Sequence, residues 1–185
     1  MINDVINDTK DRMSKSVDSL RHDLSTIRTG RASPKLIERV MVEYYGTPTP
    51  LNQIATISAP EPRLLIVKPW DPSSLAAIEK SIQTADLGLN PNNDGIIIRL
   101  AIPQLTEERR KELTRVASNR IEEARVGIRN CRRDAIRDLQ ELQNEKMISE
   151  DDYYQARDRT QELTDKTIET INEIGETKNA EIMEV

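Results

Sequence analysis

The chain has 185 residues, of which 36% are hydrophobic, 3% are aromatic and 32% are charged, with a formal net charge of -5. Its single cysteine excludes an internal disulfide, and no apolar run approaches the roughly 20 residues that a membrane-spanning helix requires. The N-terminal sequence lacks the basic-then-apolar order of a secretory signal, so we expect a cytoplasmic protein of one domain or two small ones, without membrane contact.

The first predicted element is a helix over residues 2–28. No Gly or Pro interrupts it before Gly30. Its apolar residues are spaced by four, three, four and three positions, a heptad pattern typical of helices that pack on other helices. These residues are Met13, Val17, Leu20, Leu24 and Ile27. Because so narrow an apolar stripe cannot stabilise a lone helix, this helix needs partners.

The character of the sequence changes between residues 31 and 103, where all nine prolines lie. Four runs rich in β-branched residues predict strands: RVMVEYYG, ATISA, RLLIVK and GIIIRLAI. The segments YYGTPTP, APEP and NPNNDG are typical of turns. One helix interrupts the strands, with Asp71 as its expected cap, Pro72 in its first turn and Gly88 at its end. This part of the chain therefore predicts a small β-rich (β/α/β) domain.

Two further helices are predicted after this domain. One covers residues 107–145 and would be roughly 55–60 Å long at 1.5 Å per residue. Its apolar residues keep to one stripe: Leu113, Ala117, Ile121, Ala124, Ile128, Cys131, Ala135, Leu139 and Leu142. The other begins near Ser149, where Asp152 three positions later makes a variant of the capping box. Its predicted inner face consists of Leu163, Thr167, Ile171, Ile174 and Ile182.

Together these elements predict an α+β fold, in which a long three-helix bundle carries the β-rich domain as an insert. The bundle is expected to be discontinuous, from residues 1–30 and 104–185, with the insert at 31–103. Two crossings near 29–33 and 101–105 would form a hinge, because paired linkers restrict motion mainly to a swing. Its expected residues are Gly30, Arg31, Ala32, Ser33, Ile102, Pro103, Gln104 and Leu105.

Basic charge is concentrated on the second helix of the predicted bundle. Residues 106–140 carry ten basic and seven acidic side chains, whereas residues 141–185 carry five and thirteen. Helical periodicity places the arginines on one face beside the apolar stripe: Arg125, Arg129, Arg132, Arg133 and Arg137. Guanidinium groups suit phosphate contacts, so this face predicts binding to a nucleic-acid backbone. The same pattern also fits a solvated face with local ion pairs, such as Glu122 with Arg125.

Other chemistry is weakly represented in the sequence. His22 and Cys131 are single residues of their type without further ligands at metal spacing, so we expect no metal site, and Cys131 is expected to be a packing residue. There is no glycine-rich phosphate loop and no serine, histidine and acid set, which predicts no catalytic residues, no cofactor and no enzyme activity. Trp70 is expected to anchor a core or a surface rather than to stack on bases.

Several motifs, in order and across essentially the whole chain, resemble the bacterial ribosome recycling factor family. They are STIRTGRASPKL at 25–36, VEYYGTPTPLNQIATI at 42–57, KPWDPSSL at 68–75, IPQLTEERRKEL at 102–113 and GIRNCRRDA at 127–135. Cys131 is a departure, since an aliphatic residue would be expected at that position.

The resemblance implies a bundle and an insert arranged as an L near the size of a tRNA. It also implies that the protein binds the post-termination ribosome with its bundle on large-subunit rRNA. With elongation factor G and GTP it would split the subunits and promote release of mRNA and tRNA, without catalysis of its own. We expect it to act as a monomer.

The motif match gives the expected RNA-binding residues. Arg129, Arg132 and Arg133 are the first candidates, and the others are Arg28, Arg31, Arg110 and Arg125. One alternative stays open at this point, namely a helical adaptor whose arginine face binds an acidic protein partner.

Overall fold

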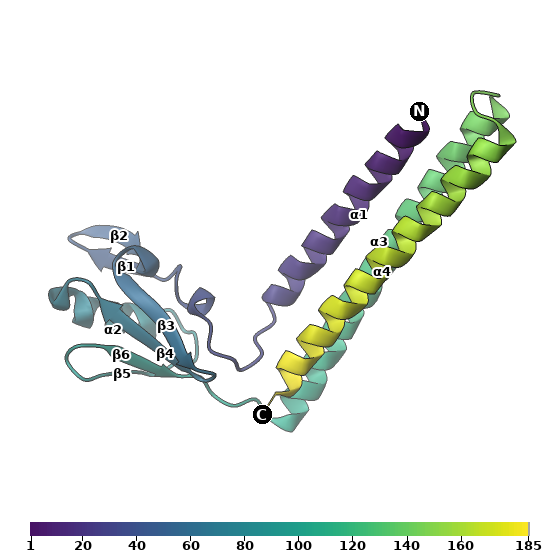
Figure 1. Cartoon of the computed structure of the whole chain (residues 1–185). Coiled ribbons are helices and arrows are strands. Elements are labelled where there is room, and N and C mark those ends of the chain that lie inside the picture. The colour runs from purple at the N-terminus through teal and green to yellow at the C-terminus, as the bar shows by residue number, and fades with distance from the viewer. Residues whose placement is uncertain (185) are drawn as a thin grey trace. The chain divides into compact units, whose positions relative to one another are not determined.

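The computed structural model describes residues 1–184 and divides them into two compact units (Figure 1). A helical unit contains Met1–Arg28 and Glu107–Glu184, and a sheet unit contains Thr29–Thr106. A long helical bundle together with a small antiparallel-sheet unit confirms the predicted α+β fold class.

The helical unit contains α1 (Ile2–Ser25), α3 (Glu107–Asn144) and α4 (Glu150–Met183). In Figure 1 the chain runs along α3, turns, and returns along α4. The predicted heptad residues of α1 are buried except Ile27, which is half-buried, because α1 ends at Ser25 rather than at residue 28. The stripe of α3 is buried as predicted except for half-buried Ala124 and Leu142.

The inner face of α4 differs from the prediction. Only Ile171 and Ile182 of the predicted set are buried, and the actual face also contains Tyr153, Ala156, Thr160, Thr164 and Gly175. Thr160 and Thr164 can be buried because each hydroxyl donates to the carbonyl four residues earlier, at 2.8 Å. Small residues, and polar residues that are hydrogen-bonded within their own helix, therefore form much of this face. A search for large apolar residues does not find such a face.

The start of α4 confirms the predicted capping box. The Ser149 hydroxyl accepts from the Asp152 backbone N–H at 3.1 Å, and the Asp152 carboxylate accepts from the Ser149 N–H at 3.3 Å. Two amide groups at the helix start are thereby satisfied, so the turn between α3 and α4 has a defined end.

The sheet unit contains six strands and one α-helix. They are β1 (Met41–Tyr44), β2 (Thr47–Pro50), β3 (Ala55–Glu61), β4 (Leu64–Pro69), α2 (Leu75–Thr84), β5 (Pro91–Asn93) and β6 (Ile98–Ala101). β1 and β2 form one antiparallel pair, and the other strands form an antiparallel sheet in the order β3-β4-β6-β5. Its core is aliphatic and includes Ile37, Val42, Leu65, Val67, Ile78, Ile82, Ile98 and Leu100.

β2 and β5 were predicted as turns because prolines mark them, and the structure corrects this. In β2, Pro48 and Pro50 pair with Glu43 and Met41. The N–H of Leu51 donates to the carbonyl of Val40 at 2.9 Å, so the hydrogen-bonded positions alternate with the two prolines. Each proline therefore occupies a position whose missing N–H would point away from β1.

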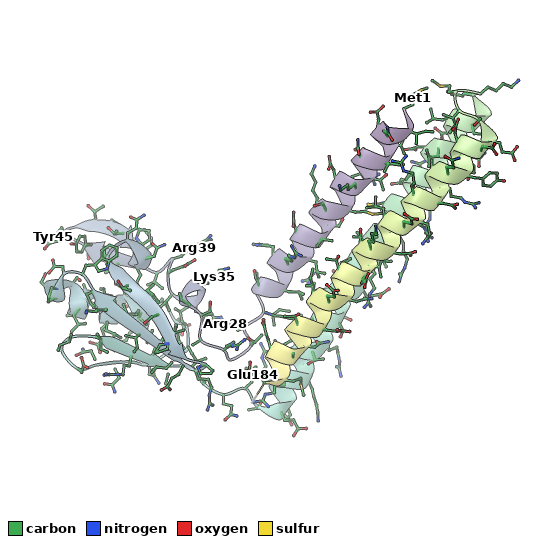
Figure 2. The ribbon with its side chains drawn as sticks, in the orientation of Figure 1. Met1, Arg28, Lys35, Arg39, Tyr45 and Glu184 are labelled. Atoms are coloured by element: carbon green, nitrogen blue, oxygen red, sulfur yellow. The ribbon has the colours of Figure 1, made fainter. Side chains whose placement is uncertain are left out.

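The β1–β2 hairpin turns through Tyr45 and Gly46, both with positive φ, at 49° and 78°. Two such residues make the turn that matches the twist of paired strands. Tyr45 is 80% exposed and points outward at the hairpin end (Figure 2), where its hydroxyl donates to Asp71 at 2.6 Å. This contact fastens the hairpin to the start of the segment that leads into α2.

The predicted helix after Trp70 begins and ends differently from the expectation. Asp71 caps a 3-10 turn, Pro72–Ser74, and α2 follows it. The helix ends at Thr84, so Gly88, with φ of 68°, lies in the loop beyond rather than at its end. Trp70 is 63% exposed and donates through Nε1 to Thr56 at 2.8 Å, which makes it a surface anchor.

Candidate nucleic-acid interface

The candidate interface is the outward side of α3, here called the arginine face. Burial of Ile121, Ile128 and Leu139 fixes the rotation of the helix. Helical periodicity then places the arginines on the face beside this buried stripe, with Arg125 and Arg132 at its edge, next to α4. The arginine face consists of Arg125, Arg129, Arg132, Arg133 and Arg137. Their contacts differ, and these differences separate structural side chains from those that are available to a ligand.

Arg125 is a link between α3 and α4. Its Nε and one terminal nitrogen donate to the amide oxygen of Asn172 at 3.0 and 2.6 Å. Its other terminal nitrogen lies 3.2 Å from the carboxylate of Glu122, the pair that the sequence suggests. With three such contacts and a side chain 32% exposed, Arg125 contributes mainly to helix packing.

Arg129 shares the same carboxylate. Its guanidinium lies 3.0 Å from Oε1 of Glu122, seven positions earlier. Hydrogen bonds from Arg129 and then from Arg125 lower the pKa of Glu122, so this carboxylate is ionised at neutral pH. The sequence analysis did not predict this pair, because the two residues are seven positions apart, beyond the usual spacing of three or four for ion pairs on a helix.

Arg132 and Arg133 form no ion pair within residues 1–184, so no carboxylate offsets their charges there. Arg132 donates to the side-chain oxygen of Gln161 on α4 at 3.3 Å, a contact with a neutral group. Arg133 is exposed and makes no ion pair or hydrogen bond within residues 1–184. These two guanidinium groups are therefore the least balanced cations of the arginine face.

Arg137 is balanced by two carboxylates. It lies 3.5 Å from both Asp134 and Asp138. Asp134 also accepts from Arg12 of α1 at 2.7 Å, which lowers the pKa of Asp134. This end of the arginine face is thus partly neutral and helps to join α1 to α3.

The other candidate RNA-binding residues have different surroundings. Arg110 is partly buried near the start of α3, and its Nε has no hydrogen-bond partner within the described residues. Arg28, labelled in Figure 2, and Arg31 are both exposed. Arg28 ends the first segment of the helical unit, whereas Arg31 belongs to the sheet unit.

Three of the expected hinge residues are fastened inside the sheet unit. The N–H of Ala32 donates to the carbonyl of Pro62 at 2.6 Å, and the N–H of Ile102 donates to that of Arg63 at 2.9 Å. Ser33 caps the following 3-10 turn. The turn between β3 and β4 therefore holds both crossings through two consecutive carbonyls.

The two crossings also meet each other. Gly30 has φ of 73°, and a Cβ added there would lie 3.1 Å from Cγ of Leu105 and 3.7 Å from the carbonyl of Pro103. Glycine is thus favoured here for two reasons, because the backbone is left-handed and because Leu105 approaches it closely. On the helical side, Lys178 donates to the carbonyl of Ile27 at 3.3 Å.

Across residues 1–184, no group of three or more His, Cys, Asp or Glu side chains is placed to hold a metal ion. The same residues contain no helix both long enough and apolar enough to cross a membrane. Cys131 is buried in the stripe of α3, in agreement with the prediction that it packs.

Comparison with known proteins identifies the family. The model of a family described as ribosome recycling factor matches residues 20–183. Relatives named ribosome-recycling factor are 52% identical in Roseiflexus sp. (strain RS-1) and 55% identical in Heliobacterium modesticaldum, over 100% of both chains in each case.

Two solved structures agree with this match. A solution structure of the ribosome recycling factor aligns with a TM-score of 0.77 and 43% identity, covering 100% of this chain and 98% of that one. Another describes models for the T. thermophilus ribosome recycling factor and the E. coli elongation factor G bound to the E. coli post-termination complex. It aligns at 46% identity with a TM-score of 0.65, over 99% of each chain. This chain therefore belongs to the ribosome recycling factor family.

Proposed function

We propose that this chain recycles ribosomes after termination. It binds the post-termination ribosome in the cytoplasm and, with elongation factor G and GTP, splits the subunits and promotes release of mRNA and tRNA. The observation that carries the proposal is full-length identity of 52% to 55% with relatives named for this activity. The protein acts as a monomer and as a mechanical factor, and GTP hydrolysis belongs to its partner.

The helical unit supplies the RNA-binding surface, through contacts of the arginine face with large-subunit rRNA. Arg132 and Arg133 lead these contacts, because no carboxylate within residues 1–184 pairs with either of them. Arg129 makes a weaker RNA contact, because its charge is partly offset by Glu122. Arg125 is held by its hydrogen bond to Asn172 and mainly stabilises the arginine face. Phosphate oxygens are suitable acceptors for such guanidinium groups.

Arg28, Arg31 and Arg110 form a second rank of RNA contacts in this proposal. Arg28 and Arg31 are exposed on either side of Thr29 and Gly30. Arg110 has a buried Nε without an acceptor in the described residues, a donor that a ligand could satisfy.

The mechanical step is a swing of the sheet unit while the helical unit stays on rRNA. The contacts of Ala32 and Ile102 with the β3–β4 turn support a hinge on the helical side of these residues. Bending then falls within 28–31 and 103–106, a range shifted by one or two residues toward the helical unit from the predicted 29–33 and 101–105. Elongation factor G would move the sheet unit, and the resulting displacement would break contacts between the subunits.

Light scattering of purified ribosomes tests this function. Addition of the protein with elongation factor G and GTP should lower the scattered intensity, and omission of any one of the three should prevent the change. Unchanged scattering with all three present would contradict the proposal. An adaptor for acidic proteins would instead co-sediment with its partner even after ribonuclease treatment, whereas a ribosome-bound factor would not.

A further inference from the structure

We propose that Glu122 is a specificity-determining residue of the arginine face. It weakens binding to flexible RNA without a fixed fold, and it holds Arg129 in position. The inference rests on the proposed function, since it assumes that this face binds rRNA. It assigns a purpose to an acidic side chain inside a basic surface.

Both oxygens of Glu122 are engaged by arginines of the same helix. Oε1 lies 3.0 Å from Arg129, and Oε2 lies 3.2 Å from Arg125. Arg125 is itself fixed to Asn172 of α4 by two hydrogen bonds. The carboxylate thus contacts, on one side, an arginine that is itself hydrogen-bonded to α4, and on the other side it restrains the second arginine.

The same contacts reduce the local charge. Arg125, Arg129, Arg132 and Arg133 carry four of the positive charges of the arginine face, and Glu122 offsets one of them. Binding to flexible RNA follows the number of phosphates that a protein neutralises, and each adds about 0.7 to the salt dependence on single strands. A carboxylate at this place therefore weakens binding to any RNA chain.

Binding to a folded rRNA surface depends on arrangement as well as on charge. Fixing a long side chain before binding avoids part of the entropy cost of ordering it in the complex. Glu122 restrains Arg129 in this way, which offsets some of the charge that it removes. Glu122 then lowers the affinity for flexible RNA more than the affinity for the ribosome, so the carboxylate raises selectivity for the ribosome.

The neighbouring residue provides a matched control. Glu123 is also an exposed acid on α3 and pairs with Arg120 at 3.3 Å, three positions away. Helical periodicity places this pair away from the arginine face. Glu122→Gln and Glu123→Gln remove the same charge, the first with two ion pairs and the second with one, but only the first changes the arginine face.

The experiment measures the affinity of both variants for poly-uridine RNA and for purified ribosomes over a range of salt. Glu122→Gln should bind poly-uridine about fivefold more tightly at 0.1 M salt, with a salt slope steeper by about 0.7. Its affinity for ribosomes should change less than twofold, and Glu123→Gln should change neither affinity as much.

Unchanged poly-uridine binding by Glu122→Gln, an equal gain in Glu123→Gln, or an equal gain for ribosomes would overturn the inference. Arg132→Ala separates this failure from that of the proposed function. If Arg132→Ala weakens ribosome binding while Glu122→Gln leaves poly-uridine binding unchanged, only the assignment of Glu122 is wrong. If wild-type protein does not bind ribosomes, the proposed function itself fails.

Discussion

Arg12 of α1 and Asp134 of α3, 122 positions apart in the chain, form an ion pair at 2.7 Å that joins the two helices. The hydrogen bond from Arg12 lowers the pKa of Asp134, and the same contact raises the pKa of Arg12. Asp134 also attracts Arg137 at 3.5 Å. This carboxylate therefore links α1 to the balanced end of the arginine face.

Replacing Asp134 by Asn should destabilise the helical unit at pH 7 and have little effect in acid. Because the folded pKa of Asp134 is lowered, its contribution is complete above its ordinary pKa of 3.8 and is lost as the pH falls further. Thermal unfolding of both proteins between pH 7 and pH 2 checks this. A stability difference that stays constant through the acid range would contradict it.

Gly175 and Gly127 should respond in opposite directions to replacement by Ala. A Cβ on Gly175 would lie 2.8 Å from Cδ1 of buried Ile121, whereas a Cβ on Gly127 meets only Ser16, at 3.9 Å. Gly127→Ala should stabilise the protein by about 0.5–1 kcal/mol, because Ala is the better helix former. Gly175→Ala should destabilise it by about 1 kcal/mol through overpacking.

Ile121→Val provides the control, because it removes the Cδ1 atom that a methyl group added at Gly175 would meet. In the Gly175→Ala background it should recover stability, while alone it should cost about 0.5–1.5 kcal/mol. Denaturant unfolding of the four proteins in a double-mutant cycle measures this coupling. Additive effects would show that the contact with Ile121 is not the cause.

The long helices could be predicted from sequence because their apolar spacing is a local property. The inner face of α4 could not, because Thr160 and Thr164 are polar residues whose hydroxyls are satisfied within their own helix. β2 was missed for a related reason, since the prolines that suggest a turn occupy positions that need no N–H.

The contacts within the arginine face could likewise be predicted only where they depend on local sequence spacing. The arginines and their shared side of α3 follow from helical periodicity, and so does the pair of Glu122 with Arg125. The second pair of Glu122, with Arg129, spans two helical turns and depends on side-chain conformation. Asn172 and Gln161 come from α4, so only packing of the two helices brings them to the site.

Asp94 should titrate with a pKa of about 2 in the folded protein. The backbone N–H groups of Ile97 and Ile96 each donate to its carboxylate at 2.9 Å, and Arg99 adds an ion pair at 2.9 Å. Backbone donors are the main cause, so Arg99→Met should raise this pKa only part of the way to 3.8. The carboxyl carbon shift of Asp94, followed by NMR against pH, measures this pKa in the wild type and in Arg99→Met.

The same titration gives the sign of a stability effect. Since the pKa of Asp94 is lowered on folding, its stabilising contribution is present above pH 3.8 and is lost as the pH falls toward about 2. Asp94→Asn should therefore narrow the difference in sheet-unit stability between neutral and acidic pH. An Asp94 carbon that titrates near 3.8 would contradict the observed set of hydrogen bonds.

Arg132→Ala should weaken ribosome binding without unfolding the helical unit. Its only hydrogen bond within residues 1–184 is with Gln161, a neutral side chain, so stability should change by less than about 0.5 kcal/mol. Loss of one phosphate contact should also make the salt dependence of ribosome binding shallower. Arg120→Ala, on the other side of α3, is the control and should leave binding unchanged. Equal affinity of wild type and a triple Ala variant at Arg129, Arg132 and Arg133 would contradict RNA binding by this face.

The hinge should show a sharp change in backbone mobility between Gly30 and Ala32. The chain is fastened at Ile27 by Lys178 in the helical unit and at Ala32 by Pro62 in the sheet unit. Nuclear spin relaxation should therefore give Ala32 and Ile102 order parameters near 0.85, typical of rigid backbone. Gly30 should have a clearly lower value, because the intervening residues must absorb the relative motion of the two units.

Gly30→Ala tests the same hinge from the other direction. The added methyl would meet Leu105 at 3.1 Å in a backbone conformation that side chains rarely adopt, so it should restrict or displace the crossing. We expect ribosome binding close to wild type but slower subunit splitting in light-scattering assays. Gly46→Ala is a control for backbone strain alone, since Gly46 has a similar φ of 78° and no atom within 4 Å of an added Cβ. If Gly30→Ala splits ribosomes at the wild-type rate, or Ala32 is as mobile as Gly30, the swing does not depend on these crossings and the mechanical proposal is wrong.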